Sequence, residues 1–507
     1  MLKYCSQVAK MRTILCLLIV MAVVCLGVVG GHKRNGSDDQ QGHEHGRGHW
    51  RDRGRGCGRD DDQEEGNDQD RGHGRDHDRG HGRDHDRGHG REHDRGHGRE
   101  HDRGHGHDHE HGHGRKHDHG HRREHGRHHC ENVTKSVIQG NADFAFRLYK
   151  QLVALPTNQN KNIFFSPLSV SLALAALSVG AKGQTHEQLF TGLGFNSSQW
   201  DQEQIGEVFQ TILTQLNQKT GVDLSVGTAL FLRNTLKPHP EFLDTMKRFY
   251  LSEGFTVDFT DTAKAIDTIN TYVKDKTRGK IDELVKDLDP ATVMYLLSYI
   301  YFKGKWEIPF DPEDTTAKPF HINDNTTVPV QMMTLKKKFW VYEDRETSTS
   351  VLHLHYNDSV SMMLVLPKNG LANLEEVICQ NHIMKWQKWM RSRVYEVYVP
   401  KLSITTKYSL KDVLSEMGMP DIFTDRANFS GISEELKVGV SEVVHQATLD
   451  VDEAGATAAA ATGVVIMPLS MHITPVLNFN RPFMVIVVDR ETKGILFMGK
   501  VINPSNK

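Results

Sequence analysis

The sequence changes character at Cys130, and this change decides which part of the chain can fold. Residues 32–129 contain 23 of the 31 histidines, no aliphatic residue and one aromatic residue, Trp50. A segment without apolar side chains cannot bury a core, so we expect residues 32–129 to be a disordered tail. From Cys130 to Lys507, apolar and polar residues are mixed without a Pro/Gly/Ser-rich linker. This composition predicts one large globular domain over residues 130–507.

The first 31 residues form a third region. Lys10 and Arg12 precede an apolar run from Ile14 to Val29 that ends in two glycines. This run is shorter than the roughly 20 residues of a membrane span. We therefore interpret residues 1–31 as a secretory signal peptide, with an uncleaved membrane anchor as the alternative, and we expect a secreted, extracellular protein.

Triplets that accept N-linked glycans support export, although about three would arise by chance in a chain of this length. The candidate glycoprotein sites are Asn35, Asn132, Asn196, Asn325, Asn357 and Asn428. Removal of the signal leaves Cys57, Cys130 and Cys379, an odd number that implies at least one free or intermolecular thiol. A bridge between Cys57 and Cys130 is one open alternative.

The tail is built on an eight-residue repeat, RGHGRDHD or RGHGREHD, that starts at Arg71. Most units carry two glycines, which disfavour a helix, so we expect an extended, solvated polymer. Neutral histidine is a common metal ligand, and the tail is therefore a candidate for weak binding of zinc, copper or nickel, without a required cofactor. The candidate ligands recur at every fourth position: His73, His77, His81, His85, His89, His93, His97, His101 and His105.

The charge of the tail depends on pH. Residues 32–129 hold 21 Lys or Arg and 23 Asp or Glu, so the tail is nearly neutral while histidine is uncharged. Moving from about pH 7.4 to about pH 6 would add on the order of 15 positive charges. Binding of heparin or another polyanion at low pH is thus a second interpretation, and a simple spacer is a third. The net charge of −3 for the whole chain indicates neither a nucleic-acid nor a membrane partner.

The globular region predicts a mixed α+β fold. Apolar residues at helical spacing predict a helix over Asn141–Leu155, and a nearly all-apolar stretch from Ser166 predicts a buried helix. We expect strands within Tyr295–Trp306, Ser361–Pro367 and Tyr395–Ile404, and a closing hairpin over Pro482–Pro504.

The globular region carries no catalytic motif, and we expect no enzymatic activity. The chain lacks Gly-x-Ser-x-Gly, a phosphate loop and a dinucleotide fingerprint, and its match to His-Glu-x-x-His, at residues 109–113, falls in the glycine-rich tail and not on a predicted helix. His445 lies in a predicted strand, where a structural hydrogen-bonding role is the favoured interpretation.

Four stretches together resemble the serpin family. They are Asn162–Asn196, Tyr299–Phe310, Val444–Thr462 and Phe479–Pro504. The resemblance spans the chain from Cys130 to Lys507, is closest to the secreted α1-antitrypsin-like group, and does not extend to the tail. It implies a serpin fold of three β-sheets and eight or nine helices, with an exposed reactive centre loop offered to a protease. Cleavage of that loop and its insertion into a sheet make such a protein a suicide substrate.

The loop of this chain suits insertion because its side chains are small. Residues Ala454–Gly463 carry no charge, and small side chains can pass between two strands without obstruction. Roughly twenty new hydrogen bonds at about 1 kcal/mol each would drive insertion. The predicted hinge consists of Glu453, Gly455, Ala456, Thr457, Ala458, Ala459, Ala460 and Ala461.

The resemblance places the cleaved bond between Leu469 and Ser470, flanked by Ile466, Met467 and Pro468. A leucine at this position indicates an apolar specificity pocket, so chymotrypsin-like serine proteases are the expected partners of a monomeric serine protease inhibitor. Two alternatives remain: a non-inhibitory carrier of a hormone or ligand, and a thrombin inhibitor similar to heparin cofactor. The second is weakened because residues 202–222 hold a single cation, Lys219.

The resemblance also implies a sheet-opening region, with Lys401 expected to pair with Glu453. One position departs from the family pattern, because Ser298 stands where an asparagine is usual. The expected members are Ser166, Ser169, Ser298, Trp306, Lys401 and His445.

Overall fold

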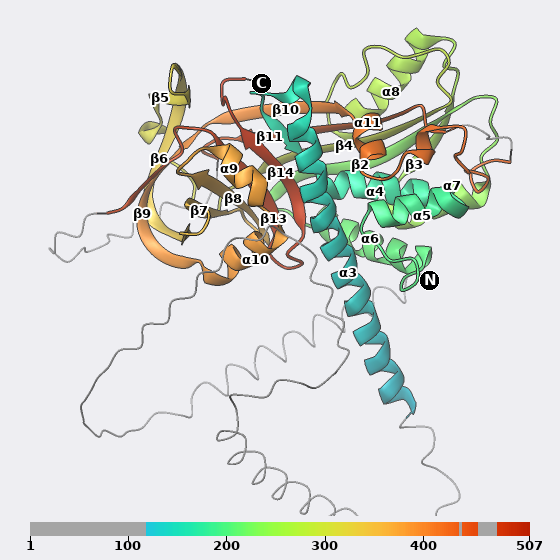
Figure 1. Ribbon diagram of the computed structural model, residues 1–507, viewed down its shortest axis with the longest axis horizontal. Helices are drawn as coiled ribbons and strands as arrows, with labels where there is room; N and C mark the ends of the chain where they lie inside the picture. Colours follow the sequence, from blue (N-terminus) through green and yellow to red (C-terminus); the bar gives the residue numbers. More distant parts are fainter. Residues whose placement is uncertain (1–117, 435–438, 455–473, 507) are drawn as a thin grey trace, which may run out of the picture. The chain divides into compact units, whose positions relative to one another are not determined.

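The computed structural model describes residues 118–434, 439–454 and 474–506, with side chains from Asn132 onward (Figure 1). Nine α-helices lie in these ranges, which agrees with the expected eight or nine. They are α3 (Asp118–Ala154), α4 (Pro167–Ser178), α5 (Gly183–Gly192), α6 (Gln202–Asn217), α7 (Pro240–Tyr250), α8 (Thr262–Lys276), α9 (Leu371–Val377), α10 (Gln380–Trp389) and α11 (Lys411–Glu416).

Fourteen strands accompany these helices in the same ranges and confirm the α+β class. They are β1 (Ile163–Phe165), β2 (Val222–Arg233), β3 (Glu253–Val257), β4 (Met294–Gly304), β5 (Thr316–Asn323), β6 (Thr326–Asp344), β7 (Thr349–His355), β8 (Val360–Pro367), β9 (Arg391–Pro400), β10 (Leu402–Ser409), β11 (Glu442–Val451), β12 (Val476–Asn478), β13 (Phe483–Asp489) and β14 (Ile495–Val501). The predicted strands and the closing hairpin of β13 and β14 are confirmed.

The described strands form two hydrogen-bonded sheets. One has nine strands in the order β1-β14-β13-β8-β7-β6-β9-β12, with β5 also paired to β6. The other has five strands in the order β10-β11-β4-β2-β3. We expected three sheets. The count differs because β6 runs without a break for 19 residues and pairs with β5, β7 and β9, so two groups of strands are joined through it.

Helix α3 begins at Asp118, ahead of the boundary that we expected at Cys130. The helical backbone thus includes the last residues of the segment predicted to be extended. Extending an existing helix by one residue is much easier than nucleating a new one, so the glycines at positions 120 and 126 do not stop it. The helix predicted over Asn141–Leu155 is the C-terminal part of α3.

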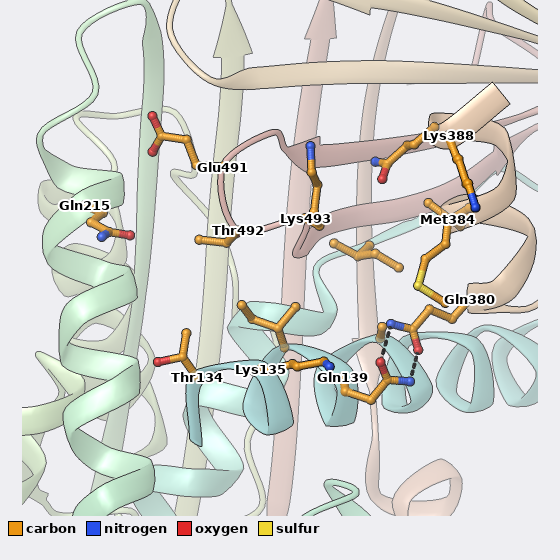
Figure 2. Close-up of a pocket in the computed structure, with 15 residues that line it drawn as sticks. Thr134, Lys135, Gln139, Gln215, Gln380, Met384, Lys388, Glu491, Thr492 and Lys493 are labelled. Atoms are coloured by element: carbon orange, nitrogen blue, oxygen red, sulfur yellow. Dashed lines mark hydrogen bonds between the residues drawn. The ribbon is translucent and has the colours of Figure 1, made fainter. Parts of the chain in front are cut away.

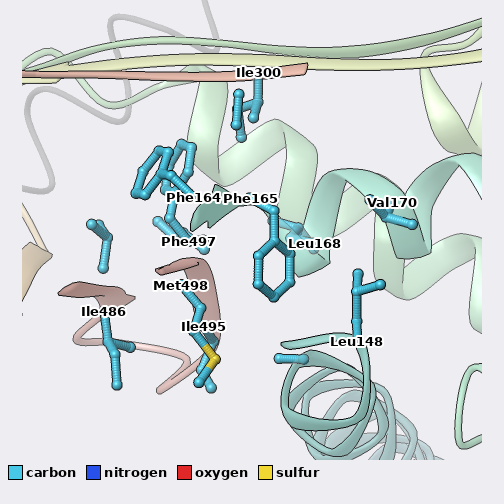
Figure 3. Packing of buried hydrophobic residues seen from close by; sticks show 14 of the residues in the cluster. Leu148, Phe164, Phe165, Leu168, Val170, Ile300, Ile486, Ile495, Phe497 and Met498 are labelled. Carbon is cyan, nitrogen blue, oxygen red and sulfur yellow. The ribbon is translucent and has the colours of Figure 1, made fainter. Parts of the chain in front are cut away.

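Helix α4 is buried on every side, as its composition predicts. All twelve of its residues are buried, and Ser166 caps its N-terminus by accepting a hydrogen bond from the Ser169 N–H at 3.0 Å. Figure 3 shows the packing around it, with Phe165 and Leu168 between α3 and the strand β14. Phe164 stacks on Phe497 of β14 with ring centroids 5.1 Å apart. The main core therefore joins both sheets to α3 and α4.

The other face of the five-stranded sheet is covered by α8. Ile269 and Val273 of this helix pack in a second core cluster with Leu297 and Tyr299 of β4. The central strands β4 and β11 are consequently buried on both faces. Within the described ranges, no helix is long and apolar enough to span a bilayer, and no group of three or more His, Cys, Asp or Glu is arranged to hold a metal ion.

Candidate functional site

The candidate site is the seam between β11 and β4 in the five-stranded sheet. The two strands run parallel and are paired over nine positions, from Glu442 opposite Tyr295 to Asp450 opposite Lys303. The chain leaves the end of β11 and is described as far as Ala454. A segment that turned back there and entered the seam would lie antiparallel to both neighbours, the stronger of the two pairing modes. The small-residue run Ala454–Gly463 has ten residues, one more than the nine pairs of this ladder.

Trp306 fixes the point where the chain leaves β11. It is 2% exposed, and its indole N–H donates to the Asp452 carbonyl at 2.7 Å. The backbone N–H of Trp306 donates to the Ala454 carbonyl at 3.1 Å. The indole stacks on Tyr356 with centroids 4.1 Å apart and planes inclined by 13°. The predicted position of Trp306 at the upper end of the opening is thus an anchor for the first residues of the loop.

Two ion pairs flank this anchor. Lys401 Nζ lies 2.7 Å from Glu453 Oε2, so the expected pair is present, and the Thr315 hydroxyl donates to Glu453 Oε1 at 2.8 Å. Lys303 Nζ lies 2.7 Å from Asp452 Oδ2. We define these four charged residues with Trp306 as the hinge anchor.

The carboxylates of the hinge anchor are held ionised. Burial alone would raise the pKa of Asp452, but the hydrogen bond from Lys303 and the backbone N–H of Ala454 outweigh it and lower the pKa. The pKa of Glu453 is lowered in the same way, with burial opposed by hydrogen bonds from Lys401, the backbone and Thr315. The hinge anchor therefore depends on ionised acids.

Beneath the middle of the seam lies a neutral polar cluster of Ser166, Ser169, Ser298 and His445, all with no exposed surface. The Ser166 N–H donates to His445 Nε2 at 3.0 Å, so the ring proton is on Nδ1, which donates to Ser298 Oγ at 3.0 Å. Ser298 Oγ lies 2.7 Å from Ser169 Oγ, which in turn donates to the Tyr299 carbonyl at 3.3 Å. The hydroxyls of Ser298 and Ser169 thus each have both a donor and an acceptor partner, and the Ser166 hydroxyl accepts from the Ser169 N–H.

This cluster crosses the seam. His445 of β11 and Ser298 of β4 are directly opposite in the parallel register, so their hydrogen bond must break if the two strands separate. Burial lowers the pKa of His445 to about 3, although its hydrogen bond with Ser298 opposes the shift. The imidazole is therefore neutral at physiological pH and, with both nitrogens engaged, has no free position for acid–base catalysis.

Most of the predicted loop residues lie outside the described residues. These are Gly455 to Ala461 of the hinge, the flank Ile466, Met467 and Pro468, and the bond Leu469–Ser470. The predicted metal-binding histidines of the tail, His73 to His105, also lie outside them.

The candidate glycosylation sites differ in accessibility. Asn132, Asn196, Asn325 and Asn428 are exposed, whereas Asn357 is half-buried in the turn between β7 and β8. The Ser359 hydroxyl of that triplet donates to Asp489 at 2.7 Å and also contacts Lys219.

Sequence reasoning missed Lys303, Thr315, Asp452 and Tyr356. Asp452 directly follows β11 and pairs with Lys303 near the end of β4, a proximity that depends on the pairing of these two strands and leaves no local signal in the sequence. Lys219 is also different from expectation. Its side chain is only 8% exposed and lies 3.3 Å from Asp489, so it is not accessible to a polyanion.

A separate cavity of about 890 Å³ lies between α3 and α10 (Figure 2). Its apolar lining includes Ile138, Ala142, Ile383, Met384 and Ile495. At one side the side chains of Gln139 and Gln380 exchange hydrogen bonds of 2.5 and 3.1 Å. Cations stand at its rim: Lys135, Lys388 and Lys493. Such an apolar cavity with a few polar groups is typical of a small-molecule site.

Next to this cavity, Cys379 at the start of α10 is disulfide-bonded. The other five cysteines lie outside the residues whose side chains are described. If residues 1–31 are a cleaved signal peptide, as predicted, the remaining partners for Cys379 are Cys57 and Cys130, and either pairing excludes the Cys57–Cys130 bridge considered above.

Comparison with known proteins agrees with this architecture. The family profile of serpins, serine protease inhibitors, matches residues 139–504. Serpin A3-3 of Bos taurus is 43% identical over 373 residues, which cover 73% of this chain and 90% of that protein. Alpha-1-antichymotrypsin of Pongo abelii is 42% identical over 370 residues, covering 72% of this chain and 87% of that protein.

Among solved structures, human thyroxine-binding globulin complexed with thyroxine is similar, with a TM-score of 0.68 and 36% identity. The match covers 74% of this chain and all of that chain. The parallel β4–β11 seam, the polar cluster beneath it, the family profile and these relatives agree: the chain belongs to the serpin family.

Proposed function

We propose that this protein is a secreted inhibitor of serine proteases that is cleaved at Leu469–Ser470 and then inserts its loop between β11 and β4. The observation that carries the proposal is the seam itself. It is a nine-pair parallel ladder, buried on both faces, with the chain leaving it directly into a run of ten small residues. As an inhibitor, the protein is a substrate of its target and not an enzyme.

The free energy available for insertion is smaller than the loop sequence alone suggests. Because β11 and β4 are already paired, insertion breaks one ladder of nine residue pairs and forms two. The net gain is therefore about half of the twenty bonds expected from the sequence, or about 10 kcal/mol. Buried apolar surface adds to this amount, while ordering of the loop reduces it.

Chymotrypsin-like proteases are the proposed targets. Leucine at the cleaved bond requires an apolar specificity pocket, and a relative named alpha-1-antichymotrypsin shares 42% identity. The test is incubation with chymotrypsin followed by a denaturing gel. We expect a stable covalent complex, and cleavage of the loop without a complex would contradict inhibition of this protease.

The variant Ala456→Arg tests insertion separately. An arginine that must enter the sheet should slow insertion. The protease then has time to hydrolyse the covalent acyl bond that joins its serine to the cleaved loop. We expect the variant to be cleaved as an ordinary substrate with little complex formed. The matched control is Ala456→Ser, which stays small and should keep inhibiting. Equal complex formation by the arginine variant would contradict the insertion mechanism.

A carrier function is the second candidate, because the cavity between α3 and α10 is large and apolar. One structural relative is described in complex with thyroxine. Titration with thyroxine, followed by tryptophan fluorescence, tests this candidate, with Met384→Arg as the variant that fills the cavity. Binding lost in this variant supports a carrier; no binding by the unmodified protein argues against one for this ligand.

The remaining alternative, a thrombin inhibitor similar to heparin cofactor, has little support. Helix α6 contains no lysine or arginine, and Lys219 just beyond it is committed to Asp489.

A further inference from the structure

A cluster of cations without acid partners lies where α10 passes into β9. Lys388, Arg391 and Arg393 are exposed, and Lys337 of β6 is exposed on the same face, two register pairs from Arg393. Within the described ranges, none of the four has an Asp or Glu oxygen within 4.0 Å. We define these four residues as the basic surface.

The basic surface is also partly hollow and aromatic. Trp389 is 49% exposed and lines a depression of about 420 Å³ together with Arg391, Arg393 and Tyr395. The acid in this depression, Glu343, is already engaged by the Ser350 hydroxyl at 2.8 Å and by Lys368 at 3.7 Å. Unpaired cations of this density attract an anionic partner.

The chain itself contains a segment of matching charge. Residues 60–70 read DDDQEEGNDQD, with seven acids and no cation, whereas in the repeats from Arg71 to Arg103 acids are interspersed with arginines. This segment begins three residues after Cys57, a candidate partner of Cys379.

The contacts of α3 decide between Cys57 and Cys130. The Tyr149 hydroxyl donates to Glu375 at 2.6 Å, and the side chains of Gln139 and Gln380 are hydrogen-bonded. Residues 375–380 therefore lie alongside the part of α3 between Gln139 and Tyr149. Cys130 also belongs to α3, but it precedes Gln139 by nine residues, about 13.5 Å along the axis. A disulfide needs Cα atoms within about 7 Å, and the geometry therefore points to Cys57.

We propose that a Cys57–Cys379 disulfide ties the tail to the start of α10 and that the acidic segment 60–70 docks on the basic surface. Helix α10 spans ten residues, about 15 Å, from Cys379 to the basic surface. The thirteen residues from Cys57 to Asp70 reach about 45 Å when extended, which is more than enough. The bridge forms when an external disulfide takes two electrons and two protons from the thiols and is reduced to a dithiol.

The tether is tested by a peptide map of the secreted full-length protein without reduction. We expect a fragment that joins Cys57 to Cys379 and separates on reduction. A fragment that joins Cys130 to Cys379 would overturn the tether.

The docking is tested on the same protein with a carbodiimide, which joins a carboxylate directly to a lysine in contact with it. Because a short tether keeps the acids near millimolar effective concentration, we expect cross-links from residues 60–70 to Lys337 and Lys388 about tenfold above those to other lysines. The matched controls are Lys264 and Lys274, which are exposed on α8. Equal yields at the four lysines would overturn the docking.

Two variants make the result specific. In Arg391→Ser/Arg393→Ser, which changes only exposed side chains, the cross-links to Lys337 and Lys388 should fall to the level of the α8 controls. A double variant of exposed cations on α7, Lys247→Ser/Arg248→Ser, should leave them unchanged. If added single-stranded DNA or heparin bound the basic surface of the unmodified protein without displacing the cross-links, the segment would not be its occupant.

Discussion

Two regions of the β4–β11 seam hold β11 by different means: the hinge anchor, where the chain leaves β11, and the polar cluster, beneath the middle of the seam. The hinge anchor uses ionised side chains at partly exposed positions, with Lys401 39% and Lys303 38% exposed. The polar cluster uses neutral hydroxyls and an imidazole with no exposed surface. Solvent-exposed ion pairs break and re-form readily, whereas a buried neutral hydrogen-bond network is lost only when β4 and β11 separate. We infer that the hinge anchor controls when loop insertion begins and that the polar cluster sets the free energy needed to separate β11 from β4.

The largest effect is expected at Trp306. Replacement by alanine removes a buried indole stacked on Tyr356 and frees the Asp452 carbonyl, so we expect a loss of about 3–5 kcal/mol in free energy of unfolding. Trp306→Phe keeps a ring but loses the indole donor and should lose about 1–3 kcal/mol. Denaturant titration measures both. Trp389→Ala is the control, since this side chain is half exposed; an equal loss there would show that burial is not the cause.

The middle of the seam is tested by Ser298→Ala. This change leaves the Nδ1–H of His445 buried without an acceptor and should cost about 1–3 kcal/mol. It should also speed spontaneous loop insertion, measured as loss of inhibitory activity on mild heating. Ser225→Ala, on β2 away from the seam, is the matched control. Unchanged stability of the Ser298 variant would mean that the cluster does not hold the seam closed.

The pH dependence separates the two regions. Because burial lowers the pKa of His445 to about 3, the folded state keeps this imidazole neutral. The unfolded chain takes up a proton there below about pH 6.5, so the contribution of His445 to the free energy of unfolding falls by about 1.4 kcal/mol per pH unit between about pH 6.5 and 3. Asp452 and Glu453 have lowered pKa values, so their contribution is present above about pH 4 and is lost only below it. Denaturant midpoints between pH 7 and 4 should fall less steeply in His445→Gln, where the similarly lowered pKa of His353 still contributes, and should keep their slope in Glu453→Gln. The reverse pattern would contradict the assignment.

The smallest effect is expected for the ion pair of Lys401 and Glu453. Since Lys401 is over a third exposed, solvent screening should limit the coupling energy to below about 1 kcal/mol. A double-mutant cycle with Lys401→Met and Glu453→Gln measures it, and the coupling should shrink further in high salt. A salt-independent coupling well above this value would place the pair in a drier environment than its exposure indicates.

Much of this architecture could be predicted from the sequence, but the state of the seam could not. The apolar stretch after Ser166 and the alternation near the C-terminus predict α4, β13 and β14, because burial on all sides leaves a continuous apolar pattern. The pair of Lys401 and Glu453 and the polar cluster followed from the serpin resemblance. The direct β4–β11 ladder, the pair of Lys303 with Asp452 and the burial of Lys219 depend on contacts between distant segments, which no local pattern encodes.

The register of the nine-pair ladder would also determine which face of the sheet each side chain of an inserted loop occupies. Side chains of an inserted strand alternate between the α4 face and the α8 face, so their assignment depends on whether the distance from the hinge is odd or even. One alanine added within Ala454–Gly463 would exchange the two faces for every later residue, and two added alanines would restore them. If the loop inserts as proposed, we expect the chain to tolerate changes of loop length in steps of two more readily than in steps of one.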